Sequence, residues 1–142
     1  MLAALAARRS FAKRGRGRIL EILHVISIVD DDRAVRLALG SFLRSLGLQV
    51  RMYESAEEFL ASGQAAYTSF LISDVRMPGI SGIEMHERLR AQGHAPATIF
   101  VTAYPTPSLQ AKAASNGALA LLQKPCQPAL INHWLSVALG NP

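Results

Sequence analysis

Five short apolar runs, separated by segments with helical spacing, constrain the fold of this chain more than any other feature. The runs predict strands and read HVISIV, LQVRMY, SFLISD, ATIFVT and ALALLQ, at residues 24–29, 48–53, 69–74, 97–102 and 118–123. Three of them are nearly continuous in apolar residues, which is typical of parallel strands covered on both faces of a sheet. The second run alternates between apolar and polar residues, so we expect it at an edge of the sheet.

The segments between these runs predict helices. Three of them carry an apolar stripe at helical spacing, and the first stripe is ended by Gly47. The stripes consist of Val35, Leu39, Phe42, Leu43 and Leu46; of Gly82, Met85, His86 and Leu89; and of Ile131, Trp134, Leu135 and Ala138. The segment 103–117 has two early prolines and few large apolar residues, so we expect its helix to begin late and pack loosely. Five strand-then-helix units predict an α/β fold, a doubly wound five-stranded parallel sheet flanked by five helices.

The net charge of +5 comes from the N-terminal end of the chain. Residues 1–23 contain six basic residues and one acidic residue, whereas residues 24–142 contain nine of each. We therefore expect one folded domain at 24–142, preceded by a basic, disordered extension at 1–23. An arm that binds nucleic acid phosphates is the alternative for this extension, and its affinity would fall with rising salt.

Membrane insertion and disulfide bonding are not expected. The apolar run at 19–29 is too short to cross a bilayer and is interrupted by Glu21 and His24. The single cysteine, Cys126, excludes an internal disulfide and a cysteine-cluster metal site. These features predict a cytoplasmic protein.

Polar side chains that carry chemistry follow four of the expected strands. Asp30 and Asp31 follow the first strand, Asp74 and Thr102 end the third and fourth, and Lys124 follows the fifth. Because the carboxyl ends of parallel strands meet at one edge, we expect these side chains to converge there. Clustered carboxylates repel each other unless they are protonated or bind a cation. Oxygen ligands favour Mg²⁺, and Mn²⁺ is an acceptable substitute.

This group of residues predicts phosphoryl acceptance. A carboxylate such as that of Asp74 can attack phosphorus and form an aspartyl phosphate. Mg²⁺, the Thr102 hydroxyl and the Lys124 ammonium would each meet one oxygen of the transferred group. Lys124 also supplies the cation that a buried carboxylate needs.

The motifs IVDDD, LISDVRMPGISG, FVTA and LQKP, in this order and spacing, resemble the receiver domain of two-component response regulators, most closely its FixJ-type branch. The resemblance covers residue 24 to about residue 139. It implies a flavodoxin-like receiver fold in the bacterial cytoplasm. It also implies phosphoryl transfer from a sensor histidine kinase or a histidine phosphotransfer protein.

The resemblance also implies a role for each acidic position. Asp74 matches the phosphoacceptor, Asp31 the direct Mg²⁺ ligand, and Asp30 the acid that acts through water. Asp74 and the backbone carbonyl of Arg76 complete the metal ligands. Asp32 is expected only to cap the following helix.

The phosphate-binding positions of the family match Thr102, the backbone N–H of Ala103 and Lys124, and the Lys124–Pro125 bond matches its usual cis peptide. Leu121 bears on switching, and Tyr104 bears on the access of water to the site. Leu121 stands where many receivers carry a Tyr or Phe that turns inward on phosphorylation, so that switch is in doubt. Tyr104, with Arg76, predicts a partly shielded site that loses phosphate slowly.

Several functions fit the sequence. The first is a phosphorylation-gated switch that binds partners, or a second copy, through helix four, strand five and helix five, without turnover as an enzyme and without direct DNA binding. A truncated receiver of a longer FixJ-type transcription regulator would look the same. A phosphorylation-independent interaction module is hinted at by Leu121. A phosphatase of the haloacid dehalogenase type would need a second acid where Arg76 stands.

Overall fold

The computed structural model describes residues 24–140, so the extension expected at 1–23 lies outside the described residues. Five parallel strands form one sheet in the order β2-β1-β3-β4-β5. The strands are β1 (Val25–Val29), β2 (Gln49–Tyr53), β3 (Phe70–Asp74), β4 (Ala97–Thr102) and β5 (Ala120–Gln123). Each lies within one of the expected runs. The alternating run forms β2, which is an edge strand as predicted.

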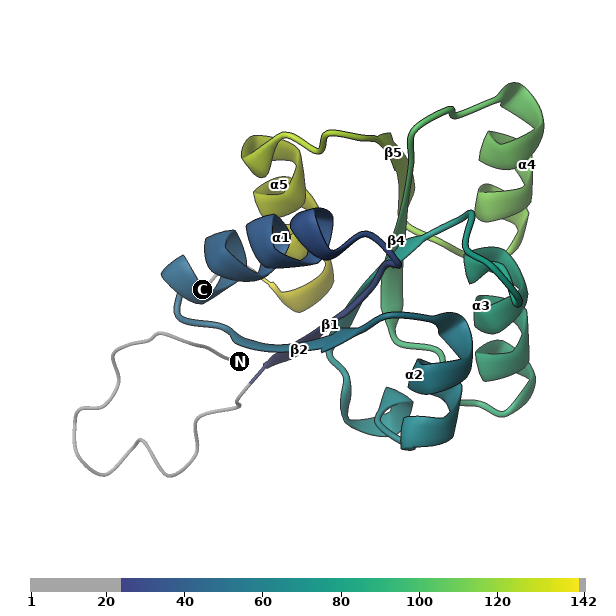
Figure 1. Ribbon diagram of the computed structural model, residues 1–142, viewed down its shortest axis with the longest axis horizontal. Coiled ribbons are helices and arrows are strands. Elements are labelled where there is room, and N and C mark those ends of the chain that lie inside the picture. The colour runs from purple at the N-terminus through teal and green to yellow at the C-terminus, as the bar shows by residue number, and fades with distance from the viewer. Residues whose placement is uncertain (1–23, 141–142) are drawn as a thin grey trace.

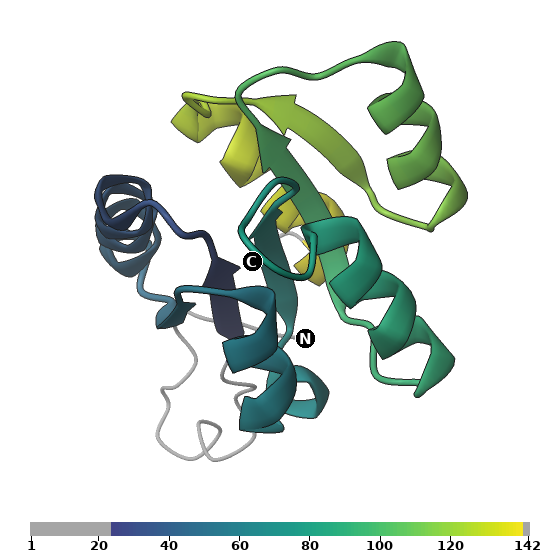
Figure 2. The same ribbon diagram turned by 45° about the vertical axis from the view of Figure 1, so that its right-hand side comes forward.

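Helices cover both faces of the sheet (Figures 1 and 2). One face carries α1 (Arg33–Ser45) and α5 (Pro128–Leu139). The other carries α2 (Ala56–Ser62), α3 (Gly82–Ala91) and α4 (Pro107–Ser115), and a short 3-10 helix at Ala65–Tyr67 follows α2. This arrangement is the doubly wound α/β fold that the sequence predicts.

The alternation of side chains along each strand divides the core between the two faces. Under α1 and α5, the strands bury one set of side chains: Ile26, Ile28, Phe70, Ile72, Ile99 and Val101. Their neighbours Val29, Leu71 and Phe100 point to the opposite face and pack under α2, α3 and α4. All three inner strands are therefore buried on both sides, which explains their continuous apolar sequences.

Helix α1 begins with a side-chain cap. The Asp32 carboxylate accepts hydrogen bonds from the backbone N–H groups of Ala34 and Val35, at 2.9 and 3.3 Å. The capping role expected for Asp32 is confirmed. At the other end the expected stripe is one residue too long, because Leu46 lies beyond the last turn and is 41% exposed. The chain leaves the helix at Gly47, whose φ of 84° suits glycine.

Helix α4 begins late and is weakly anchored, as the sequence predicts. Residues 103–106 separate it from β4, and Thr106 caps its first turn. Ala113 is the buried residue of this helix, and Leu109 packs partly against the same cluster. Among the described helices, none has the length and apolar composition needed to cross a bilayer.

Candidate functional site

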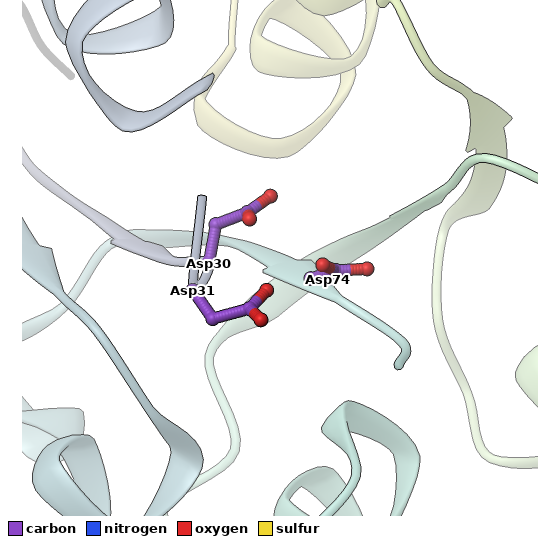
Figure 3. A group of neighbouring side chains, drawn as sticks. All are labelled: Asp30, Asp31 and Asp74. Carbon is purple, nitrogen blue, oxygen red and sulfur yellow. The ribbon is translucent and has the colours of Figure 1, made fainter. Parts of the chain in front are cut away.

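The carboxyl ends of β1 and β3 bring three carboxylates together. Asp74 is the last residue of β3, and Asp30 follows β1, where its backbone N–H donates to the Tyr53 carbonyl at 3.1 Å. Asp31 is the next residue and is exposed, whereas Asp30 and Asp74 are buried. Figure 3 shows the three side chains gathered at the ends of the two neighbouring strands. The convergence expected from the sequence is present.

Lys124 reaches the same place from the end of β5. Its Nζ atom lies 3.0 Å from Oδ2 of Asp74 and 2.8 Å from Oδ2 of Asp30. The Lys124 backbone N–H donates to the Thr102 carbonyl at 2.8 Å, which holds the residue beside β4. The Lys124–Pro125 peptide bond is cis, as expected. The sheet thus places one ammonium group between two buried carboxylates.

The acidic cluster fits a hard cation. One oxygen from each of Asp30, Asp31 and Asp74 lies within 4.8 Å of the others. Oδ2 of Asp30 is buried and accepts no backbone hydrogen bond from the described residues; its partner is the Lys124 amine at 2.8 Å. This oxygen therefore has room to act as a ligand for a metal ion as well. The all-oxygen donors and the exposed Asp31 suit Mg²⁺, which retains water ligands.

Burial, together with the charges and hydrogen bonds within the cluster, shifts the pKa values of Asp74 and Lys124. Burial raises the pKa of Asp74 and the neighbouring Asp30 charge adds to this, while the Lys124 hydrogen bond offsets only part of the rise. Burial alone would lower the pKa of Lys124, but the hydrogen bonds and charges of Asp30 and Asp74 outweigh it and raise that pKa. The amine therefore remains charged, and the carboxylate of Asp74 depends on nearby cations.

The remaining predicted residues lie around this cluster. Thr102 is buried at the end of β4, and its Oγ1 accepts a hydrogen bond from the Tyr104 backbone N–H at 3.4 Å. The Arg76 backbone N–H donates to Oδ1 of Asp74 at 3.3 Å. Ala103 and the Arg76 side chain are exposed, and Tyr104 is 76% exposed. The ligand role of the Arg76 carbonyl, the phosphate-binding role of Ala103 and the shielding by Tyr104 stay predictions.

Leu121, which the sequence places at the predicted switch position, points into the core. It packs with Val75, Ile83, Phe100 and Ala113 between β4, α3 and α4. An inward apolar side chain therefore already fills this place. The effect of Leu121 on switching stays a prediction.

Sequence reasoning missed Arg36, which supports the site from α1. Its Nη1 donates to the backbone carbonyl of Asp30 at 2.6 Å, and Nη2 lies 3.8 Å from Glu54. The Arg36 side chain is buried and holds the segment that carries Asp30 and Asp31. In the sequence, Arg36 is marked only as a basic residue that lies between two members of the first apolar stripe, Val35 and Leu39.

Gly82 belongs to the second apolar stripe of the sequence. The sequence does not reveal the steric requirement for glycine at this position. A Cβ atom at this position would lie 2.0 Å from the Asp74 carbonyl oxygen and 2.8 Å from Oγ of Ser73. Helix α3 therefore packs directly on the backbone of the residue predicted to accept the phosphoryl group.

Comparisons with known proteins place this geometry in a family. The model of the response regulator receiver domain matches residues 26–135. The transcriptional regulatory protein FixJ of Azorhizobium caulinodans is 38% identical over 116 residues, which are 82% of this chain and 55% of that protein. The response regulator protein TmoT of Ectopseudomonas mendocina is 38% identical over 111 residues, 78% of this chain and 50% of that protein. This chain thus spans about half the length of the curated relatives it matches.

Solved structures agree with these relatives. The crystal structure of FixJ-N has a TM-score of 0.72 and 31% identity, covering 81% of this chain and 92% of that chain. The chemotaxis protein CheY4 of Vibrio cholerae has a TM-score of 0.76 and 27% identity, covering 83% and 100%. Since the family model matches most of the chain, and the fold and a FixJ relative agree with it, this chain belongs to the response regulator receiver domain family.

Proposed function

We propose that this domain accepts a phosphoryl group on Asp74 with the help of Mg²⁺, and that this acceptance changes its binding to partners. The donor is the phosphohistidine of a sensor histidine kinase or of a phosphotransfer protein. The observation that carries the proposal is the position of the Lys124 amine, 3.0 Å from Asp74 and 2.8 Å from Asp30. A buried carboxylate held beside a cation and two further acids suits this chemistry better than a structural ion pair, which needs one acid only.

In the proposed transfer, an Asp74 oxygen forms a bond to phosphorus while the bond from phosphorus to the donor imidazole nitrogen breaks. The released imidazole nitrogen takes up a proton. Mg²⁺, held by Asp31, Asp74 and the Arg76 carbonyl with Asp30 nearby, would neutralise charge on the phosphoryl oxygens when bound. Lys124 would turn from the carboxylate pair to one phosphoryl oxygen, and the Thr102 hydroxyl would donate to another.

Phosphorylation would then act as a population shift. A dianionic group on Asp74 favours the arrangement in which Thr102 and Lys124 close around it. Because Thr102 ends β4, which leads into α4, and Lys124 follows β5, which leads into α5, these elements are where we expect partner binding to change. A homodimer through α4, β5 and α5 remains a prediction on the same grounds, and light scattering with and without phosphate would test it.

The test is phosphate uptake from acetyl phosphate and Mg²⁺, followed by intact-mass measurement. We expect the native protein to gain one phosphoryl group and Asp74→Asn to gain none, with an unchanged circular dichroism spectrum. Asp32→Asn is the matched control, because Asp32 caps α1 and lies outside the acidic cluster. Uptake by Asp74→Asn, or by none of the three proteins, would refute the assignment.

Slow loss of the phosphate, rather than steady turnover, is part of the same proposal. Release of phosphate from small phosphomonoesters at a steady rate would favour the phosphatase alternative instead. Full partner affinity in Asp74→Asn would favour the phosphorylation-independent module. Regulation of transcription, which the name of the FixJ relative states for that protein, would require the part of such proteins that this chain does not span.

A further inference from the structure

We propose that Glu57 of α2 is a positioning residue for the metal site, because it fixes the loop 77–80 and thereby the Arg76 carbonyl. This inference rests on the proposed function, in which that carbonyl is a Mg²⁺ ligand. Glu57 lies 23 residues before Ile80 in the chain. It belongs to α2, whereas the loop that it contacts connects β3 to α3. It is not among the residues that the sequence motifs single out.

The carboxylate of Glu57 lies directly against the loop backbone. Its Oε2 accepts a hydrogen bond from the Ile80 backbone N–H at 3.0 Å. A Cβ atom added to Gly79 would lie 2.2 Å from the same oxygen, so no other residue type fits this approach unless Glu57 moves. Gly79 also has a φ of 81°, which disfavours other residues independently. The loop and the carboxylate are therefore fitted to each other.

The inner side of the loop is anchored to the same helix. Met77 is buried and packs in one cluster with Ala56 and Phe59 of α2. The hydrogen bond from the Ile80 N–H is the main reason that the pKa of Glu57 is lowered, and the Glu57 backbone N–H adds to it. The acceptor thus stays ionised at neutral pH. Helix α2 holds the loop through Met77 from inside and through Glu57 from outside.

Arg76 is the residue whose position depends on this arrangement. Its predecessor, Val75, is fixed to the sheet, because its N–H donates to Val101 at 3.0 Å and its carbonyl accepts from Gly82 at 2.9 Å. Its successor, Met77, begins the segment that α2 holds. The Arg76 N–H is held by Oδ1 of Asp74 at 3.3 Å, whereas the Arg76 carbonyl belongs to the next peptide unit, which leads into residues 77–80. We therefore expect loss of the Glu57 contact to loosen this loop and with it the proposed ligand carbonyl, while β3 keeps Asp74 in place.

The chain offers a matched control in Glu58. This residue lies in the same first turn of α2 and carries the same charge, but its Oε1 accepts from the Glu54 backbone N–H at 2.7 Å and makes no described contact with the loop. Glu58→Gln removes one negative charge at nearly the same place. Glu57→Gln removes the charge but keeps an amide oxygen that can accept from Ile80, whereas Glu57→Ala removes both.

Three measurements test the proposal. Isothermal titration with Mg²⁺ should show binding by Glu57→Ala weakened roughly threefold to tenfold, as expected for the loss of one charge-assisted hydrogen bond. Glu57→Gln and Glu58→Gln should stay within about twofold of the native protein. In the absence of metal, hydrogen exchange of the Ile80 amide should be faster in Glu57→Ala alone. At saturating Mg²⁺, phosphate uptake by Glu57→Ala should return to the native rate.

The outcomes separate this inference from the proposed function. Native protein that does not bind Mg²⁺, or binds it equally after Asp31→Asn, overturns both. Native binding that is lost in Asp31→Asn but unchanged in Glu57→Ala overturns the role of Glu57 only. Equal weakening in Glu57→Gln and Glu57→Ala also overturns it, because the effect would then come from charge and not from the hydrogen bond.

Discussion

The Nζ atom of Lys124 lies 3.0 Å from Oδ2 of Asp74, although 50 positions separate the two residues in the chain. The same amine is 2.8 Å from Asp30, and the Lys124 side chain is 18% exposed. One cation therefore compensates two buried carboxylates. It also competes with any metal ion for the same oxygens, so removal of the amine should affect stability and metal binding in opposite directions.

Replacement of Lys124 by Met should lower the free energy of unfolding by about 1–3 kcal/mol without Mg²⁺, because two buried carboxylates lose their partner. Mg²⁺ binding should be at least as tight as in the native protein, since the competing charge is gone. Urea unfolding with and without Mg²⁺ measures both effects. Lys112→Met, on the exposed side of α4, should change neither. Weaker Mg²⁺ binding in Lys124→Met would contradict a shared set of oxygens.

Gly82→Ala should lower the free energy of unfolding by about 3 kcal/mol or more, because backbone rather than a flexible side chain blocks the new Cβ atom. The shift of α3 against Asp74 should also slow phosphate uptake. Gly40→Ala in α1 is the control, since its Cβ would meet the end of the Met52 side chain at 3.3 Å. Thermal unfolding of both variants gives the comparison. Equal stability of the two variants would mean that α3 can move away from the Asp74 carbonyl without a measurable loss of stability.

Arg36→Met should destabilise the fold by about 1–3 kcal/mol, because the Asp30 carbonyl loses a charged donor. Since Arg36 holds the backbone between β1 and α1, Mg²⁺ affinity should fall as well. Calorimetric titration of Mg²⁺ together with urea unfolding tests this. Arg44→Met, at the exposed end of the same helix, should leave Mg²⁺ affinity unchanged. A loss of stability with native Mg²⁺ affinity would limit Arg36 to a structural role.

His86 should make the protein less stable in mild acid. It is buried in α3, where its Nδ1 accepts from Nδ2 of Asn116 at 2.8 Å, and its ring meets Phe100 edge-on. Burial, and then the charge of Arg90, lowers the pKa of His86 below its ordinary value of 6.5. The unfolded chain therefore binds more protons below pH 6.5, so the free energy of unfolding falls as the pH decreases from there.

Replacement of His86 by Gln should flatten this dependence below pH 6.5, and chemical unfolding at several pH values measures the slope. The raised pKa of Asp74 acts in the opposite direction, but it is common to both proteins and cancels in the comparison. Parallel curves for the native protein and His86→Gln would contradict the burial of a neutral ring.

The sequence predicted the elements that depend on local pattern. Continuous apolar runs identified the inner strands, alternation identified β2, and the order of strand ends predicted that Asp30, Asp74 and Lys124 would meet. These predictions succeed because a parallel sheet brings all its carboxyl ends to one edge, whatever the details of packing. The prediction that Leu46 belongs to the buried stripe of α1 was wrong, because periodicity does not reveal that the helix ends one residue earlier, at Ser45.

The supporting contacts could not be predicted from the sequence. Arg36, Glu57 and Gly82 act through backbone atoms, namely the Asp30 carbonyl, the Ile80 N–H and the Asp74 carbonyl. Backbone N–H and carbonyl groups are the same at almost every residue, so a pattern of residue types does not indicate which side chain will contact a given backbone atom. His86 was expected only as a member of an apolar stripe, because its hydrogen bond to Asn116 at the end of α4 depends on how two helices pack.

Helix α4 rests on the sheet through one buried alanine and a half-covered leucine, so moving it would expose very little apolar surface. Displacing α4 would therefore expose less buried apolar surface than displacing α1 or α5. We expect a change in charge at the end of β4 to shift the average position of α4 more readily than that of those two helices. The scarcity of large side chains in this segment is then what would allow the site and the outer surface of α4 to be coupled.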